Sequence, residues 1–155
     1  MKNMRRIERQ MEEKQALELL QQGEYGILAT TDRNHQPYGI PLSYVLINNS
    51  IYFHCAAAEG HKLQNIAENS KVCFTIVAHT HLLPEKFSTE YKSVIVFGIA
   101  SIIDDNEEKI MALREFVKKY SGAFILEGNQ YIENAQHKTI VFKLMIQSFK
   151  GKHRV

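Results

Sequence analysis

Residues 51–62, IYFHCAAAEGHK, carry an apolar, strand-like run into three alanines and then break at Glu59–Gly60 before a histidine and a lysine. The apolar run predicts a strand, and the glycine predicts a turn into a new element. A tight turn with solvated polar residues is one interpretation of this pattern. The other is that a flat, anionic molecule comes close to the backbone here.

The segment after this turn predicts a short helix that begins at His61, because Leu63, Ile66 and Ala67 have helical spacing. The first amides of a helix have no partner within the helix and form its positive end, which favours anions. Gly60 permits close approach of the backbone, and Lys62 adds a charge suited to phosphate. Spacing alone leaves both interpretations open, a phosphate site or a plain turn.

The rest of the chain predicts a mainly β protein with flanking helices. Helices are expected at about 4–22 and from Asp105, a capping-box-like start, to Gly122, and loops are expected at 80–90 and 122–137. Six strands are predicted, at 25–31, 38–47, 51–56, 71–79, 91–104 and 138–149. Six strands joined mostly by short turns favour a small antiparallel barrel in a single domain, 1–155. Side chains fill a barrel this small, so a large ligand would bind outside it or at a subunit contact.

Composition excludes several classes of protein. A formal net charge of +2, with both signs mixed along the chain, argues against nucleic acid as the main partner. Two cysteines form no disulfide framework, which predicts free thiols in a reducing compartment. The charged amino end lacks a signal core, and the longest apolar run, 93–103, is about half of what spans a bilayer. We therefore expect a cytoplasmic protein without a membrane partner, whose basic end, FKGKHRV, is a solvated tail.

The predicted hairpin of 41–44 and 52–56 could hydrogen-bond the edge of a planar heterocycle, or Ser43 and His54 could simply face water. A metal site is not expected, because the neighbouring strand residues His54 and Cys55 point to opposite faces. A hydrolase is not expected either, since the sequence has no nucleophile-elbow motif.

Taken together, the stretches GEYGILAT, QPYGIPLSYV, IYFHCAAAEGHKLQNI, KVCFTIV, YKSVIVFGIA and EEKIMALREFVKKY resemble one known family. They are similar to the nitroimidazole-resistance branch of the pyridoxamine 5'-phosphate oxidase-like flavoproteins, over about residues 1–152. The resemblance implies a six-stranded split β-barrel that binds flavin mononucleotide (FMN) at the interface of a homodimer.

The resemblance also implies a set of site residues. His61 is the implied catalytic residue, where a substrate could stack and take a proton, and Lys62 is the better candidate for the phosphate. Ser93 and Val94 would approach the cofactor from another strand pair, within the chain or across the dimer. The full set of implied cofactor contacts is Pro41, Leu42, Ser43, Tyr44, Phe53, His54, Cys55, Ala56, His61, Lys62, Ser93 and Val94.

The function implied is a flavin-dependent oxidoreductase that reduces small aromatic or nitro compounds. Electrons would come from NAD(P)H bound transiently over the flavin, since no GxGxxG motif is present. Pyridoxamine phosphate is not the expected substrate, because this chain has no tryptophan and lacks the oxidase's characteristic carboxyl end. The alternative is a non-catalytic module of the same fold that holds flavin or haem, and a third possibility is an interaction protein with an empty pocket.

Overall fold

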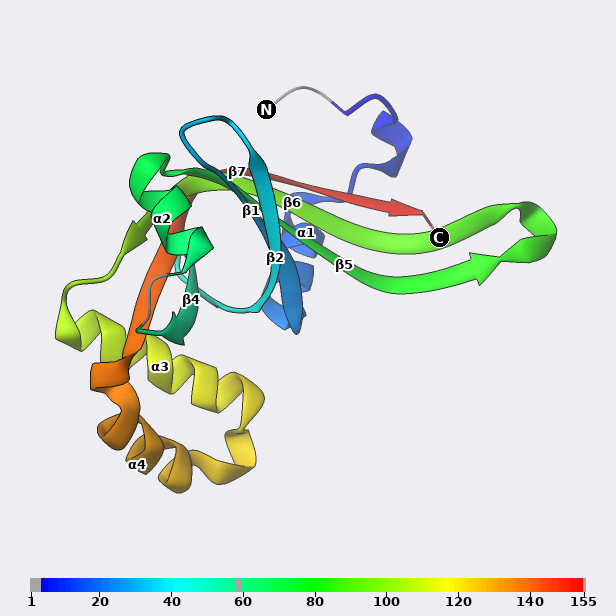
Figure 1. The fold of residues 1–155 in the computed structure, drawn as a ribbon. Helices are drawn as coiled ribbons and strands as arrows, with labels where there is room; N and C mark the ends of the chain where they lie inside the picture. The colour runs from blue at the N-terminus through cyan, green and yellow to red at the C-terminus, as the bar shows by residue number, and fades with distance from the viewer. Residues whose placement is uncertain (1–3, 58–59, 155) are drawn as a thin grey trace.

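A seven-stranded antiparallel sheet forms the centre of the computed structural model, which describes residues 4–57 and 60–154. The sheet curls into an open half-barrel (Figure 1), in agreement with the predicted mainly β fold. Its strands are β1 (Tyr25–Thr31), β2 (Pro37–Ser43), β3 (Val45–Ile47), β4 (Ser50–Ala56), β5 (Lys71–Leu83), β6 (Ser88–Ile102) and β7 (Thr139–Arg154). They are arranged in the order β2-β1-β5-β6-β7-β4-β3. The helices are α1 (Glu13–Gln22), α2 (His61–Glu68), α3 (Asn106–Tyr120) and α4 (Ile125–Ala135).

The predicted number of six strands is wrong, because the expected strand 38–47 is two strands that separate at Tyr44. β2 and β3 lie at the two opposite edges of the sheet, although only Tyr44 stands between them in the chain. The chain therefore passes from one edge of the half-barrel to the other at this residue. We call Ser43–Tyr44–Val45 the seam.

Two hydrophobic clusters lie on opposite faces of β4. Inward side chains such as Phe53, Phe74 and Phe142 fill the half-barrel, which α1 closes with Leu20. Outward side chains of β4 and β7 pack instead against α3 and α4, where Phe116 is buried. The strand alternation thus gives β4 one face toward the barrel and one toward the helices.

The start of α3 ties this second cluster to the sheet. Asp105 caps the helix by accepting from the Glu108 amide at 2.7 Å, as the capping-box pattern predicted. The Glu108 carboxylate accepts from the Tyr52 hydroxyl at 2.7 Å and pairs with Lys143 at 2.6 Å. These hydrogen bonds, that of Lys143 first, lower the pKa of Glu108.

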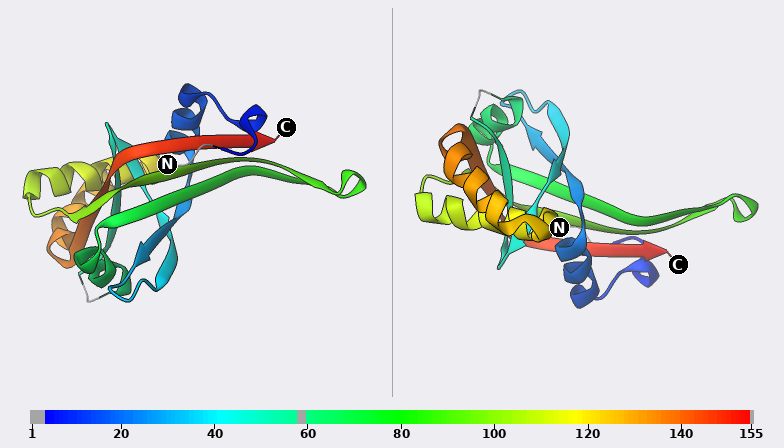
Figure 2. Two further views of the ribbon diagram at one scale, coloured as in Figure 1. Left: turned by 90° about the horizontal axis from the view of Figure 1, so that it is seen from above. Right: turned by 90° about the horizontal axis from the view of Figure 1, so that it is seen from below.

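The expected loop 80–90 is instead the end of a long hairpin, which projects from the sheet on the side away from α3 and α4 (Figures 1 and 2). β5 and β6 continue to pair as far as Leu83 and Ser88, past an irregularity between Ala78 and His81. Pro84 opens the short turn at the tip, and Phe87 there is 98% exposed. The loop was expected because the pairing on both sides of this turn joins residues distant in the sequence and leaves no clear local pattern.

Both predicted chain ends need correction. The expected helix 4–22 begins only at Glu13, and Ile7–Arg9 forms a single 3-10 turn. The basic carboxyl end is not a solvated tail, because β7 pairs with β6 as far as Arg154. Gly151 is buried within this strand against α1.

The expected loop 122–137 is also wrong, because it contains α4. This helix packs against α3 to form an antiparallel pair beside β4 and β7 (Figure 1). Gly128 permits this packing, since a Cβ atom there would lie 2.4 Å from a Val117 methyl carbon. Among the described residues, no helix is long and apolar enough to cross a membrane.

We predict that Gly98→Ala destabilises the protein. A Cβ atom at Gly98 would lie 2.2 Å from the Met145 carbonyl oxygen, where β6 and β7 shift register. Backbone cannot give way as a side chain can, so we expect a loss of about 1–3 kcal/mol in the free energy of unfolding. Urea denaturation of the natural protein and the variant measures this difference in the free energy of unfolding. Gly122→Ala is the matched control, since no atom lies within 4 Å of its added Cβ, and equal losses would contradict the prediction.

Candidate functional site

Tyr44 anchors the seam to three separate elements. Its side chain is fully buried, with the ring edge-on to Phe74 of β5 at 4.9 Å. Its hydroxyl donates to the carbonyl of Leu20 in α1. Its amide donates to the Tyr120 hydroxyl at 3.0 Å, and its carbonyl accepts from the Lys119 ammonium at 3.0 Å, both from α3. Contacts with α1, β5 and α3 therefore hold the seam in place.

Lys119 brings a positive charge to the seam in a partly buried position. Its nitrogen lies 4.0 Å from the centre of the Tyr44 ring and 5.2 Å from that of Tyr120, which are cation–π contacts. Burial lowers the pKa of Lys119 to about 8 and raises the pKa values of both tyrosines. Sequence analysis missed Lys119 and Tyr120, because nothing in a helical pattern says which distant backbone its last turn meets.

The seam and β4 are linked through α3. β3 pairs with β4 only as far as Val45 and Tyr52, and Ser43 pairs instead with Tyr25 of β1. Tyr120 of α3 binds Tyr44, and Phe116 of the same helix contacts both Tyr120 and His54. His54 lies edge-on to Phe116 at 4.5 Å, and partial burial lowers its pKa.

Cys55 packs toward the barrel interior, on the face opposite His54, as the strand alternation predicted. Cys55 and Cys73 are both free and partly buried. Within residues 4–57 and 60–154, no group of three or more His, Cys, Asp or Glu side chains could hold a metal ion.

α2 begins at His61, as predicted. The carbonyl of Gly60 accepts the amides of Leu63 and Gln64, so the amides of His61 and Lys62 have no acceptor within the helix. Together with Lys62 they give this end of α2 positive character. Ala58 and Glu59, which belong to the predicted turn, lie outside the described residues.

Polar contacts hold α2 against β1 and the β1–β2 turn. The Asn65 amide donates to the Thr30 hydroxyl at 2.9 Å, and both side chains are almost fully buried. Glu68 accepts from the Arg33 amide and side chain at 2.8 and 3.1 Å, and these bonds lower the pKa of Glu68. The His61 ring packs on the Tyr38 ring of β2, with the ring centres 4.2 Å apart and the planes tilted by 30°. Asn65 could have been noticed in the sequence as a polar residue on the apolar face of its helix.

The predicted site residues differ in what they can offer a ligand. Tyr44, Phe53 and Val94 are fully buried, so none of the three exposes a surface to a ligand in this chain. The more accessible side chains are Pro41, Ser43, His54, Ala56 and His61, and those partly covered are Leu42, Cys55, Lys62 and Ser93.

Ser93 and Val94 lie apart from the predicted site residues at the end of β4. Ser93 pairs with Lys152 of β7, whereas His54 pairs with Val141 of the same strand. These two β7 positions are separated by eleven residues (152 − 141), which corresponds to roughly 35 Å of strand. Within one chain, Ser93 and Val94 are therefore distant from the end of β4.

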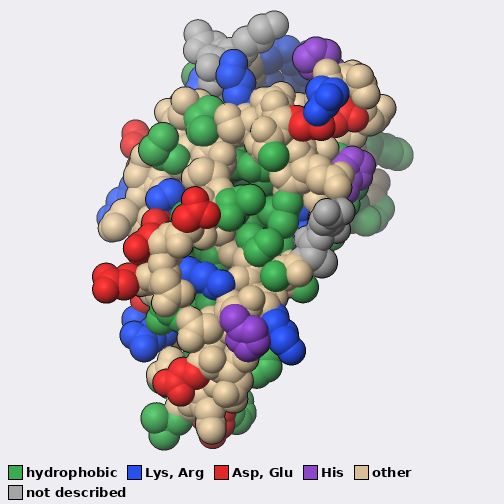
Figure 3. Space-filling model, turned by 60° about the vertical axis from the view of Figure 1, so that its left-hand side comes forward, with side chains coloured by type: hydrophobic (Ala, Val, Ile, Leu, Met, Phe, Trp, Pro, Cys, Tyr) green, Lys and Arg blue, Asp and Glu red, His purple; other side chains and the backbone are tan. Residues whose placement is uncertain are grey.

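A cavity of about 480 Å³ lies between the outer face of β4 and the two helices α3 and α4. Figure 3 shows hydrophobic side chains exposed among charged ones on the face that carries α2, α3 and α4. His54, Cys55 and Ala56 line the cavity, so three predicted site residues belong to it.

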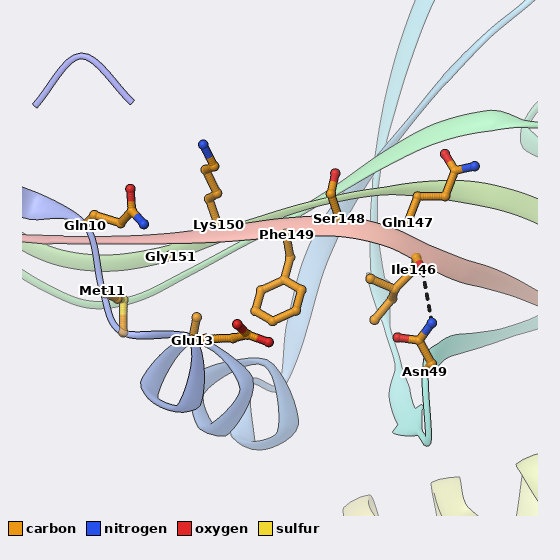
Figure 4. Close-up of a pocket in the computed structure, with 11 residues that line it drawn as sticks. Gln10, Met11, Glu13, Asn49, Ile146, Gln147, Ser148, Phe149, Lys150 and Gly151 are labelled. Atoms are coloured by element: carbon orange, nitrogen blue, oxygen red, sulfur yellow. Dashed lines mark hydrogen bonds between the residues drawn. The ribbon is translucent and has the colours of Figure 1, made fainter. Parts of the chain in front are cut away.

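A second cavity, of about 420 Å³, lies between α1 and β7 (Figure 4). Its lining side chains diverge: Ser148 and Lys150 point to one side of β7, and Phe149 and Ile146 point to the other. No predicted site residue lines it. Polar groups do not converge there, so the first cavity is the better candidate for a site.

A family model described as pyridoxamine 5'-phosphate oxidase matches residues 12–153. The chain therefore belongs to this family, as the sequence motifs indicated. No curated protein sequence matches the chain.

Solved structures with this fold come from several bacteria. A candidate 5-nitroimidazole antibiotic resistance protein from Bacteroides thetaiotaomicron is 23% identical, with a TM-score of 0.78, over 93% of this chain and 86% of that one. An FAD-binding protein from Mesorhizobium loti is 18% identical, with a TM-score of 0.70, over 95% and 98%. The haem storage protein HutZ from Vibrio cholerae is 16% identical, with a TM-score of 0.64, over 88% and 92%. At these identities the likeness establishes the fold.

We predict that the buried pair Asn65–Thr30 is energetically coupled. Asn65→Ala leaves the Thr30 hydroxyl buried without its partner, which costs about 1–3 kcal/mol of unfolding free energy. In Thr30→Val the Asn65 amide is left unpaired instead. The double variant should therefore lose less than the sum of the two single losses, as measured by urea denaturation. Simple addition would show that the two side chains do not interact.

Lys119 should make stability depend on pH. Burial lowers its pKa to about 8 in the folded protein, so above that pH the unfolded chain binds more protons than the folded one. Burying the charged Lys119 ammonium lowers the free energy of unfolding, and this cost is fully present below about pH 8. As the pH rises from about 8 toward the ordinary lysine pKa, the cost disappears and the free energy of unfolding increases. Burial also raises the pKa values of Tyr44 and Tyr120, which moves their titration away from this interval.

In Lys119→Met this contribution is absent. We expect the Tm of the natural protein, relative to the variant, to increase between about pH 7 and about pH 9.5. Calorimetry of both proteins measures the difference. Parallel Tm curves for the two proteins would contradict the assignment of this pH dependence to Lys119.

Proposed function

We propose that this protein is an FMN-dependent oxidoreductase that reduces small aromatic or nitro compounds. The observation that carries the proposal is the match of the pyridoxamine 5'-phosphate oxidase family over residues 12–153. The similar fold of a candidate 5-nitroimidazole resistance protein suggests the class of substrate. The substrate in the family's name is not carried over, because fold and family do not determine the substrate.

The residues at the start of α2 fit the phosphate of FMN. The amides of His61 and Lys62 lack helical acceptors, and Lys62 supplies a positive charge. The exposed residues Ser43 of the seam and Ala56 at the end of β4, both small, would border a flat ring system. Lys119 places a positive charge beside the seam, which would favour electron uptake by a nearby ring. A bound flavin would supply the hydride-transfer chemistry, and the protein would supply position, charge and protons.

His61 is proposed as the proton donor to the substrate. Its ring is exposed to solvent and stacks on Tyr38, so its orientation is defined. A histidine changes its charge near neutral pH and suits this role. NAD(P)H is the proposed electron donor and would bind only transiently.

A homodimer is part of the proposal. The separation of Ser93 and Val94 from the end of β4 within one chain supports the proposal that they approach the cofactor from a second chain. The outer face of the sheet also exposes apolar side chains on neighbouring strands, which a partner could cover. They are Ile27, Val77, Ile95, Phe97 and Met145, each 40–58% exposed.

A second candidate function is a non-catalytic module that holds flavin or haem. It is favoured by the fold's likeness to an FAD-binding protein and to a haem storage protein. Turnover distinguishes the two functions, since a storage or sensing module would bind its cofactor without consuming NAD(P)H.

An absorption spectrum tests the cofactor directly. The protein, purified and then supplied with FMN, should keep the visible bands of oxidised flavin after desalting, and NAD(P)H with a nitroaromatic compound should then be consumed. A haem spectrum, or flavin bound without turnover, would favour the module. A protein that retains no flavin would exclude the proposed activity.

Lys62→Ala should weaken FMN retention more than His61→Ala does. Lys62 is assigned to the phosphate, whereas His61 is assigned to the substrate and is already packed on Tyr38. A lost charge–phosphate contact should raise the Kd for FMN about tenfold or more. Fluorescence quenching of FMN measures Kd for both variants. Equal losses in both would refute this division of roles.

A further inference from the structure

We propose that the cavity between β4 and the α3–α4 pair is the binding site of the electron donor, NAD(P)H. Resting on the function proposed above, this inference assigns the nicotinamide and its adjoining phosphate to the cavity and leaves the substrate beside His61. His61 does not line the cavity. The donor does not need it, because the donor passes a hydride, two electrons with one proton, to the flavin and leaves as NAD(P)⁺.

The charge of the cavity lining favours an anionic ligand. Lys138 contributes a cation from the 3-10 turn Gln136–Lys138, and no acidic side chain lines the cavity. Among the described residues, no carboxylate forms an ion pair with the exposed Lys138 side chain. A lysine ammonium binds phosphate as a point charge. The lining therefore matches a ligand that carries a phosphate.

The remaining walls suit a flat, uncharged ring. The helices contribute apolar side chains such as Leu113, Phe116 and Ile132, and the paired residues Ala56 and Thr139 form a floor of small side chains. The volume of about 480 Å³ is that of a small-molecule site. A ligand with an uncharged ring at one end and a phosphate at the other matches both parts of the lining. The reduced nicotinamide half of NAD(P)H is such a ligand.

Polar groups of the lining can orient this half of the donor. The Gln136 side chain makes no hydrogen bond within the part of the chain that the structure describes, so its amide is available to the nicotinamide carboxamide. Partial burial lowers the pKa of His54, and its neutral imidazole can bind a ribose hydroxyl. The Thr139 hydroxyl is already engaged, because it donates to the Ala135 carbonyl at 3.0 Å.

The cavity reaches the strand end at which the flavin ring is proposed to lie. Ala56 lines the cavity and is also one of the two small residues proposed to border the ring. Hydride transfer requires the nicotinamide and the flavin ring to be in contact. A nicotinamide held over Ala56 would meet this requirement, and the donor and the substrate would then approach the flavin beside different residues.

Calorimetric binding of donor analogues that cannot react tests the site. The probes are tetrahydro-NADH and tetrahydro-NADPH, in which the nicotinamide ring is hydrogenated and cannot transfer hydride. Lys138→Met removes the charge and Ala135→Leu fills the cavity, so we expect each variant to raise the Kd about tenfold or more. Lys138→Arg keeps the charge and should lose less. Tetrahydronicotinamide riboside, which has no phosphate, should bind Lys138→Met and the natural protein equally.

The two half-reactions of the FMN-loaded protein give a second readout. Without oxygen, stopped-flow absorbance follows the reduction of the flavin by NAD(P)H, and separately the oxidation by metronidazole of protein that dithionite has reduced. Lys138→Met should raise the donor concentration for half-maximal reduction about tenfold and leave the oxidation rate unchanged. His61→Ala should have the opposite effect, with slower oxidation and unchanged reduction.

Lys71→Met is the matched control, since Lys71 is exposed and lies outside the cavity. It should leave the Kd for both probes unchanged, and the Tm of each variant reports whether it folds. The Lys138 side chain is exposed, so Lys138→Met keeps the test valid if Ala135→Leu does not fold.

The outcomes separate this inference from the proposed function. Probe binding that depends on Lys138 and Ala135, in a protein that retains no FMN, would support the donor site and exclude the FMN-dependent activity. Retained FMN with turnover, and probe binding that is unchanged in both variants or absent from the natural protein, would overturn the donor site alone.

Discussion

The buried Tyr44 side chain is the contact on which the rest of the site depends. It occupies the seam where the chain crosses between the two edges of the sheet, and it binds α1, β5 and α3 at once. If this anchor were lost, the edges of the half-barrel would no longer be held to each other or to α3. The position of β4 beside α3, and therefore the cavity that contains His54, follows from it.

The strand register divides the expected cofactor residues into two groups. α3 links the seam to His54 of β4, whereas Ser93 lies far from His54 along β7. A filled barrel has no room for a flavin inside it. We therefore propose a cofactor site at the surface of the chain, to which a second chain contributes.

Local patterns predicted the parts of the fold that local physics determines. Alternating apolar residues identified β4, and the glycine break followed by helical spacing placed the start of α2 at His61. The errors occurred where distant segments decide the structure. The hairpin at 80–90 depends on pairing between strands, and the division of 38–47 depends on Tyr44 meeting three distant elements. Lys119 was missed for the same reason, because only the folded chain shows that its ammonium reaches the seam.

Amide hydrogen exchange with and without FMN tests the central claim, that the cofactor binds along the seam, the end of β4 and the start of α2. The account predicts slower exchange on adding FMN in peptides that cover 43–45 and 51–62, and in those that cover 91–95 if a second chain completes the site. Protection confined to 10–16 and 146–151, around the cavity between α1 and β7, would contradict it.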